Sequence, residues 1–176
     1  EKVQAEFYDQ DEEMFYYTGN NSENLIARKK EIFDNVIPSS NAIMTENLYR
    51  LSIIFDREDL RDTHQKMMNK VKEFIKKDPE FMSYWASTAT SKLSRQIEIS
   101  IVGRDYIEIS REISRTPRLN QVIMASEEPS KLPLMDYKTT NDGVTTIYVC
   151  SEKTCRRPVT SIEAAEKELE ILVGSK

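Results

Sequence analysis

Two closely spaced cysteines are the first residues in this sequence whose types and spacing could do chemistry. Cys150 and Cys155 form a C-x4-C pair at the end of a predicted strand. A catalytic redox pair usually has C-x-x-C spacing at the start of a helix. A zinc site needs four ligands, and only His64 is spare. We therefore interpret the pair as two structural thiols or an incidental disulfide, with a minor redox role as the alternative.

Acidic side chains are abundant, but they do not form a recognisable catalytic pair. Paired carboxylates can act as general acid and base, yet runs such as Asp11-Glu12-Glu13 in a predicted turn are usually solvated. The single histidine, His64, is interpreted as a surface or packed residue. The chain has only 4 glycines, so a glycine-rich phosphate loop is not predicted. We assign no catalytic residue, no metal ligand and no cofactor, and whether the protein is an enzyme stays open.

The segment 28–41 is the strongest candidate for ligand binding. It brings many polar side chains to the start of a predicted helix, where backbone N–H groups favour anionic or hydroxyl-rich ligands. The alternative is that these side chains cap the helix and bond within the loop. The residues predicted to line a pocket are Asp34, Asn35, Ser39, Ser40 and Asn41.

Antiparallel helical hairpins are predicted for residues 1–96. Aromatic runs on either side of the acidic turn indicate a short β-hairpin within 7–17. Asp78 and Pro79 are typical of the N-cap and first position of a helix. Short turns between amphipathic helices favour antiparallel neighbours. Helices are predicted over residues 1–8, 41–55 and 59–77, and from 79 onward.

A small α/β unit is predicted for residues 97–176. Its alternation of strands and helices favours a βαβ core with a mainly parallel sheet, and Thr160 or Ser161 is expected to cap the last helix. Strands are predicted at 97–103, 121–125 and 144–150, an edge strand at 132–137, and helices at 104–116 and 161–173. The expected fold class is therefore mixed α and β.

Composition excludes several classes of function. The net charge of −5 makes general nucleic-acid binding a poor hypothesis, because such proteins carry basic patches. No apolar run approaches the ~20 residues of a membrane-spanning helix. The sparse cysteines favour a reducing compartment, so a cytoplasmic location is expected. The start at Glu1, without an initiator Met or signal pattern, is interpreted as a cut inside a longer chain.

Two motifs resemble a known family. The first comprises 15–19 and 25–41, ending in Ile37-Pro38-Ser39-Ser40-Asn41; the second is Tyr148-Val149-Cys150, followed by Cys155 and Pro158. Both resemble the C-terminal half of the YyaL-like, spermatogenesis-associated, thioredoxin-domain-containing proteins. The resemblance implies a larger parent with an N-terminal thioredoxin-like domain and an (α/α) toroid, like those of six-hairpin glycosidases and N-acylglucosamine 2-epimerases. This chain would hold the last helices of that toroid and the α/β unit that follows it.

The resemblance leads to two hypotheses of function. In the first, the chain is part of a carbohydrate-binding or carbohydrate-active toroid, whose ligand is a sugar or sugar phosphate. In the second, it is a non-catalytic scaffold or interaction module for the thioredoxin-like domain of the parent. Without the thioredoxin-like and toroid regions, apolar helix faces would be exposed, and self-association is expected.

Overall fold

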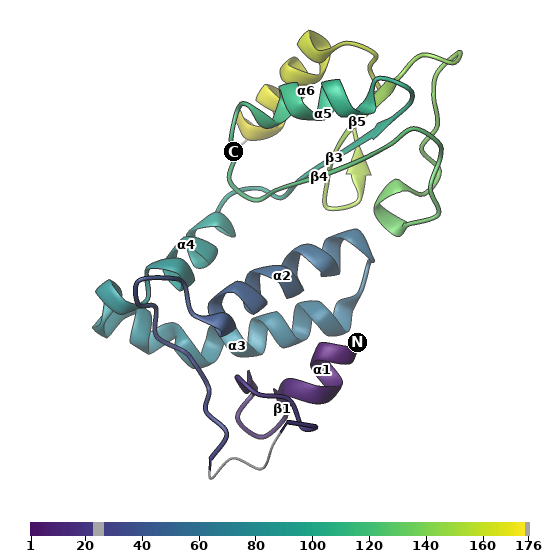
Figure 1. Ribbon diagram of the computed structural model, residues 1–176. Helices are drawn as coiled ribbons and strands as arrows, with labels where there is room; N and C mark the ends of the chain where they lie inside the picture. Colours follow the sequence, from purple (N-terminus) through teal and green to yellow (C-terminus); the bar gives the residue numbers. More distant parts are fainter. Residues whose placement is uncertain (23–26, 175–176) are drawn as a thin grey trace. The chain divides into compact units, whose positions relative to one another are not determined.

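The protein is a mixture of helices and strands arranged in two compact units (Figure 1). The computed structural model describes residues 1–22 and 27–174, so Leu25 and Ile26 of the first motif lie outside the described residues. The first unit comprises 1–52 and 57–90, and the second comprises 53–56 and 91–176. The sequence placed its boundary after residue 96. Within the described ranges, no helix is long and apolar enough to cross a membrane.

The first unit is a helical hairpin accompanied by a small β-hairpin. The predicted helices at 1–8, 41–55 and 59–77 are confirmed within a few residues, and so is the β-hairpin, whose two strands pair antiparallel. In Figure 1, α2 and α3 run side by side in opposite directions. The elements of this unit are α1 (Lys2–Phe7), β1 (Tyr8–Asp9), β2 (Met14–Phe15), α2 (Ser40–Ile54), α3 (Glu58–Lys77), η1 (Pro79–Phe81) and α4 (Ser83–Ser91).

The core of the first unit is formed by apolar side chains of β2, α2, α3 and α4, together with Met82 just before α4. His64 is packed into it, and its Nδ1 donates a hydrogen bond to the Thr45 carbonyl oxygen at 2.9 Å. One of the two interpretations of His64, a packed residue, is therefore confirmed. The buried apolar residues are Met14, Phe15, Ala42, Leu48, Leu60, Met67, Met68, Val71, Met82 and Trp85.

The third helix begins differently from the prediction. Pro79 opens a short 3-10 turn, and the α-helix α4 starts only at Ser83. Asp78 and Pro79 take the predicted N-cap and first positions, but they do so in the 3-10 turn, and the side chain of Asp78 makes no capping hydrogen bond. The backbone N–H of Tyr84 donates instead to the carboxylate of Asp34, 50 residues earlier. A tertiary contact thus satisfies a helix end that the local sequence was expected to cap.

The second unit is a four-stranded sheet in the order β4-β3-β5-β6. Only β3 and β4 are parallel, while β3–β5 and β5–β6 are antiparallel, so the prediction of a mainly parallel sheet is wrong. The long connection 127–145 carries no α-helix that would return the chain for a parallel crossover, only the short 3-10 turn η2. The elements are β3 (Ile97–Val102), α5 (Tyr106–Ser114), β4 (Gln121–Ser126), η2 (Pro133–Met135), β5 (Thr146–Ser151), β6 (Thr154–Cys155) and α6 (Ile162–Gly174).

Both faces of the central strand β3 are covered. Ile97, Ile99 and Ile101 belong to the apolar core that includes residues of α5 and α6, which lie over one face in Figure 1. The alternate residues belong to the opposite face, where the hydroxyl of Ser100 donates to the Leu134 carbonyl oxygen of η2 at 3.0 Å. All six residues of β3 are buried. The edge strand predicted at 132–137 is wrong, because the chain there forms the 3-10 turn of η2.

Candidate functional site

Asn41 links three separate backbone segments of the first unit. Its Oδ1 accepts a hydrogen bond from the Phe15 N–H at 2.8 Å, and its Nδ2 donates to the Phe15 carbonyl oxygen at 2.9 Å. The same Nδ2 donates to the carbonyl oxygen of Glu31 at 2.8 Å. The residue is fully buried. Its amide therefore pairs with Phe15 as a neighbouring strand would, and it holds the loop 27–39 against the β-hairpin.

Asp34 also joins separate backbone segments of the first unit through hydrogen bonds. One carboxylate oxygen accepts a hydrogen bond from the Ser39 N–H, and the other accepts one from the Tyr84 N–H, each at 2.8 Å. Its own N–H donates to the Phe81 carbonyl oxygen at 2.7 Å. Asp34 is 6% exposed. The carboxylate thus fixes the turn before α2 and caps the start of α4, where negative charge is favoured.

The remaining three predicted ligand-binding residues divide between burial and exposure. Ser39 is buried, and its hydroxyl accepts a hydrogen bond from the Ala42 N–H at 3.2 Å, as expected for a cap of α2. Ser40 and Asn35 are exposed. The structure therefore brings Asp34, Ser39 and Asn41 together as an internal hydrogen-bonded clasp, and only Ser40 and Asn35 present side chains to solvent. Ligand binding by these five residues stays a prediction.

A charged cluster that the sequence did not reveal binds the same loop to the β-hairpin. Lys30 donates to the Asp9 carboxylate at 2.5 Å, and the Tyr16 hydroxyl donates to the same oxygen at 2.6 Å. The guanidinium of Arg28 lies 3.9 Å from the centroid of the Tyr16 ring. The hydrogen bonds from Lys30 and Tyr16 hold the pKa of Asp9 well below its usual range. No local pattern predicts this cluster, because Lys30 and Asp9 are 21 residues apart.

Replacing Lys30 by Met should make the free energy of unfolding depend less on pH in the acid range. Because the pKa of Asp9 is lower in the folded than in the unfolded state, its carboxylate stabilises the fold at pH values above the unfolded-state pKa of about 4. This stabilisation is lost as the pH falls toward the folded-state pKa. The urea midpoint of the wild-type chain should therefore fall more steeply below about pH 5 than that of Lys30→Met. The exposed neighbour Lys29 offers the control, and Lys29→Met should keep the wild-type slope. Parallel pH profiles for wild type and Lys30→Met would contradict the assignment.

The second unit contains the cysteine pair as a disulfide. Cys150 lies at the end of β5 and Cys155 in β6, directly opposite each other in the antiparallel ladder, and their sulfur atoms are bonded at 2.04 Å. Cys150 is fully buried, whereas Cys155 is exposed. The bond therefore joins a fully buried residue to an exposed one.

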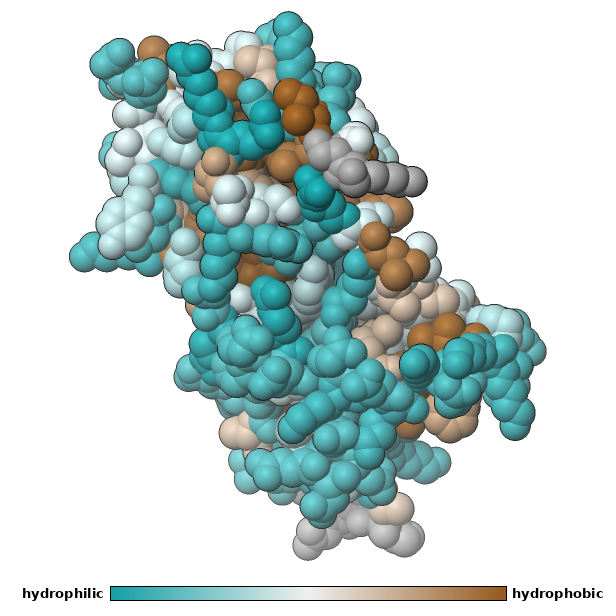
Figure 2. Space-filling view, turned by 180° about the vertical axis from the view of Figure 1, so that it is seen from behind, coloured by the Kyte–Doolittle hydropathy of each residue, from teal (hydrophilic) through white to brown (hydrophobic). Residues whose placement is uncertain are grey.

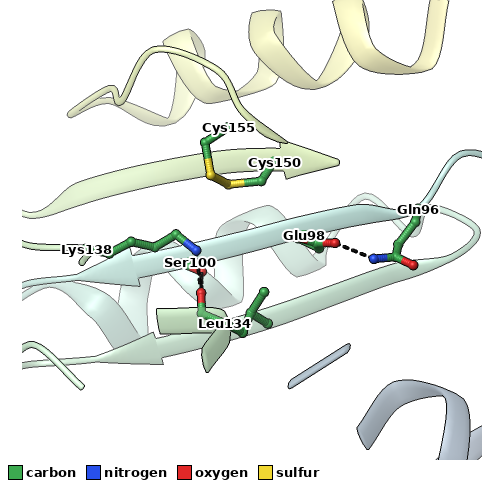
Figure 3. Close-up of a disulfide and its surroundings, with 7 residues drawn as sticks. All are labelled: Gln96, Glu98, Ser100, Leu134, Lys138, Cys150 and Cys155. Atoms are coloured by element: carbon green, nitrogen blue, oxygen red, sulfur yellow. Dashed lines mark hydrogen bonds between the residues drawn. A yellow bond between two sulfur atoms is a disulfide. The ribbon is translucent and has the colours of Figure 1, made fainter. Parts of the chain in front are cut away.

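Polar and charged side chains lie on the same face of the sheet as the buried sulfur (Figure 3). Glu98 is the direct register partner of Cys150, is 4% exposed and accepts a hydrogen bond from Gln96. Lys138 donates to the Leu134 carbonyl oxygen, and burial lowers the pKa of its ammonium group while the Glu98 charge opposes that decrease. No local pattern singles out either residue, because Glu98 occupies a regular strand position and Lys138 lies in a loop.

Neither a metal-site pattern nor a comparison with known proteins assigns a function to the clasp, the charged cluster or the disulfide. Throughout residues 1–22 and 27–174, no three His, Cys, Asp or Glu residues are grouped so that they could hold a metal ion. No protein-family model matches the chain, and no curated protein matches it. Any proposal about function therefore depends on the structure of the described residues themselves.

Proposed function

We propose that this chain is a non-catalytic interaction module that binds other polypeptides through an apolar surface on its first unit. The observation that carries the proposal is a group of exposed apolar side chains around the loop before α2. We call this group the loop patch. It consists of Phe33, Val36, Ile37, Phe74 and Phe81.

The loop patch is assembled from three parts of the first unit. The rings of Phe33 and Phe74 meet edge to face with centroids 5.7 Å apart, which joins the loop to the end of α3. Phe81 of η1 is adjacent, because its carbonyl oxygen accepts the hydrogen bond from the Asp34 N–H. Figure 2 shows hydrophobic side chains interrupting the hydrophilic surface on the right of the view, the side of η1 and α4.

The apolar residues of the loop patch are strongly exposed and lie together, unlike the single apolar residues that are common on protein surfaces. Val36 is 96% exposed and Ile37 is 69% exposed, and both lie between Asp34 and Ser39, which the clasp joins by a hydrogen bond. Clustered exposed apolar side chains are typical of protein–protein contacts in soluble proteins. The clasp therefore has a clear role in this proposal, since it presents Val36 and Ile37 in a fixed position.

The family resemblance supports a choice of partner. In the parent protein that it implies, the helices of the toroid and the thioredoxin-like domain are the surfaces available to this chain. We propose that a second copy of the chain covers the loop patch when these regions are absent, because contact between two apolar surfaces needs no charge pairing.

The double variant Val36→Asp/Ile37→Asp should reduce self-association of the chain. Two carboxylates in the loop patch must be desolvated on contact, so the association constant should fall by at least about ten-fold. Sedimentation equilibrium over a range of concentrations measures this constant. Leu119→Asp is the matched control, because Leu119 is an exposed apolar residue of the second unit. A wild-type chain that remains monomeric at the highest concentration, or an equal loss in Leu119→Asp, would reject the proposal.

The carbohydrate hypothesis stays a prediction and has a separate test. Thermal unfolding against monosaccharides and sugar phosphates detects any ligand that binds the native state. Asn35→Ala and Ser40→Ala are the informative variants, because both side chains are exposed, whereas Asp34 and Asn41 are part of the clasp. A rise in the unfolding temperature for one sugar, abolished by either variant, would favour the carbohydrate hypothesis over the interaction module. A cytoplasmic location likewise stays a prediction.

A further inference from the structure

Two tight turns in the second unit differ in how well their residues suit their backbone. Residues 141–144 form a turn closed by hydrogen bonds between Asn141 and Val144 in both directions, and its central residues have positive φ: 50° at Asp142 and 76° at Gly143. Asp-Gly is a favoured pair for a two-residue turn of this kind. This turn closes without a covalent link.

The turn between β5 and β6 also has positive φ at its two central residues, but these residues are of types that disfavour positive φ. Ser151 and Thr154 are paired, and the central residues Glu152 and Lys153 have φ values of 48° and 65°. Residues with long side chains rarely adopt positive φ, and two in succession are disfavoured in a two-residue hairpin. The local sequence therefore opposes the conformation in which the structure holds this turn.

The disulfide is located where it can hold that turn closed. Cys150 and Cys155 are the next register pair outside Ser151 and Thr154, so the covalent bond joins the two ends of the strained turn. Beyond it, the Arg156 N–H donates to the Val149 carbonyl oxygen at 2.9 Å. Farther along, Val159 exchanges two hydrogen bonds with Ile147. The segment from Ser151 to Cys155 thus depends most on the disulfide, while Val159 has its own backbone anchor.

The two residues joined by the disulfide differ in exposure. Cys155 is exposed at the edge of the sheet, whereas Cys150 is fully buried opposite the Glu98 carboxylate. Thiol–disulfide exchange proceeds by attack of a thiolate on an accessible sulfur. We propose that the Cys150–Cys155 disulfide is an exchange site for a dithiol, that the dithiol attacks Cys155, and that reduction opens the Ser151–Thr154 turn.

The exchange balances with a dithiol as the only reductant. One thiolate of the dithiol bonds to Sγ of Cys155, the Cys150–Cys155 bond breaks, and its electron pair stays on Sγ of Cys150. That sulfur takes up the proton that the attacking thiol released when it became a thiolate. The second thiol of the dithiol then attacks the dithiol sulfur that is bonded to Cys155 in the mixed disulfide. It forms the oxidised dithiol and releases Cys155, which takes up the second proton.

The equilibrium constant for reduction by dithiothreitol tests the coupling to the turn. In Glu152→Asn/Lys153→Gly the closed turn is no longer disfavoured, so the oxidised form is stabilised. The equilibrium constant should fall by about ten-fold relative to wild type. Asp142→Asn changes the other, already favourable turn and should leave the constant unchanged. An unchanged constant in the double variant, or a wild-type disulfide that dithiothreitol reduces only after urea unfolding, would overturn the proposal.

Two further measurements test the site of attack and the opening. Incubation with glutathione followed by mass spectrometry should place the mixed disulfide on Cys155, and glutathione on Cys150 would contradict the assignment. Hydrogen exchange of the reduced chain should show loss of protection at the Arg156 amide and retained protection at Val159. Retained protection at both amides would show that the turn stays closed and would refute the opening. These outcomes are independent of the loop patch, because they report only on the second unit.

Discussion

Replacing Asn41 by Ala should cost the first unit about 4 kcal/mol of unfolding free energy. The substitution removes the acceptor for the Phe15 N–H and the donor for the carbonyl oxygens of Phe15 and Glu31. Each buried polar group that loses its partner costs roughly 1–3 kcal/mol, and Ala leaves no polar atom to replace the amide. Urea unfolding followed by the fluorescence of Trp85, which is buried in the same core, measures the loss.

The matched control for this prediction is Asn35→Ala. Asn35 belongs to the same loop but is exposed, so its replacement should change stability by no more than about 0.5 kcal/mol. Equal stabilities of the Asn41 and Asn35 variants would show that the amide of Asn41 does not hold the loop. The comparison also bears on ligand binding, because a residue committed to three backbone contacts is poorly placed to exchange them for a ligand.

Replacing Asp34 by Ala should cost about 3 kcal/mol. The backbone N–H groups of Ser39 and Tyr84 would lose their carboxylate acceptor, and the start of α4 would lose a stabilising negative charge. Because the two bonds belong to different segments, we expect the loop before α2 and the first turn of α4 to loosen together. Hydrogen exchange of the Ser39 and Tyr84 amides, combined with urea unfolding, measures both effects.

An exposed aspartate on α3 serves as the control for Asp34. Asp62→Ala removes the same charge from the chain without removing a clasp contact, and its stability should stay within about 0.5 kcal/mol of wild type. If Asp34→Ala retained protection at Ser39 and lost it only at Tyr84, the carboxylate would be a helix cap alone. The proposed role of Asp34 in presenting Val36 and Ile37 would then be rejected.

The regular elements were predictable because their causes are local. Apolar spacing along α2 and α3 follows the helical period, and the residues of β3 and β5 have the composition of buried strands. Two caps were also predictable, since Ser39 and Ser161 each accept a hydrogen bond from an N–H three residues later. Such contacts depend only on residues within one turn of the chain.

The partners of the polar residues were not predictable from spacing. For Asp34 the sequence left ligand binding and capping open, and the structure shows that it caps α4, whereas Asp78 makes no capping bond with its side chain. A carboxylate near a helix start can serve either purpose, and the distinction depends on which N–H group the fold brings within 3 Å. The same reasoning applies to the cluster of Lys30, Asp9 and Tyr16.

The sequence by itself determined most of the helices and strands and the net negative charge, because these follow from short-range periodicity and composition. Tertiary structure alone decided that β5 runs antiparallel to β3, that Asn41 replaces a strand neighbour for Phe15, and that the buried Cys150 is bonded to an exposed Cys155. Each of these outcomes depends on backbone groups far apart in the chain meeting at hydrogen-bonding or covalent distance. Local pattern carries no information about such meetings.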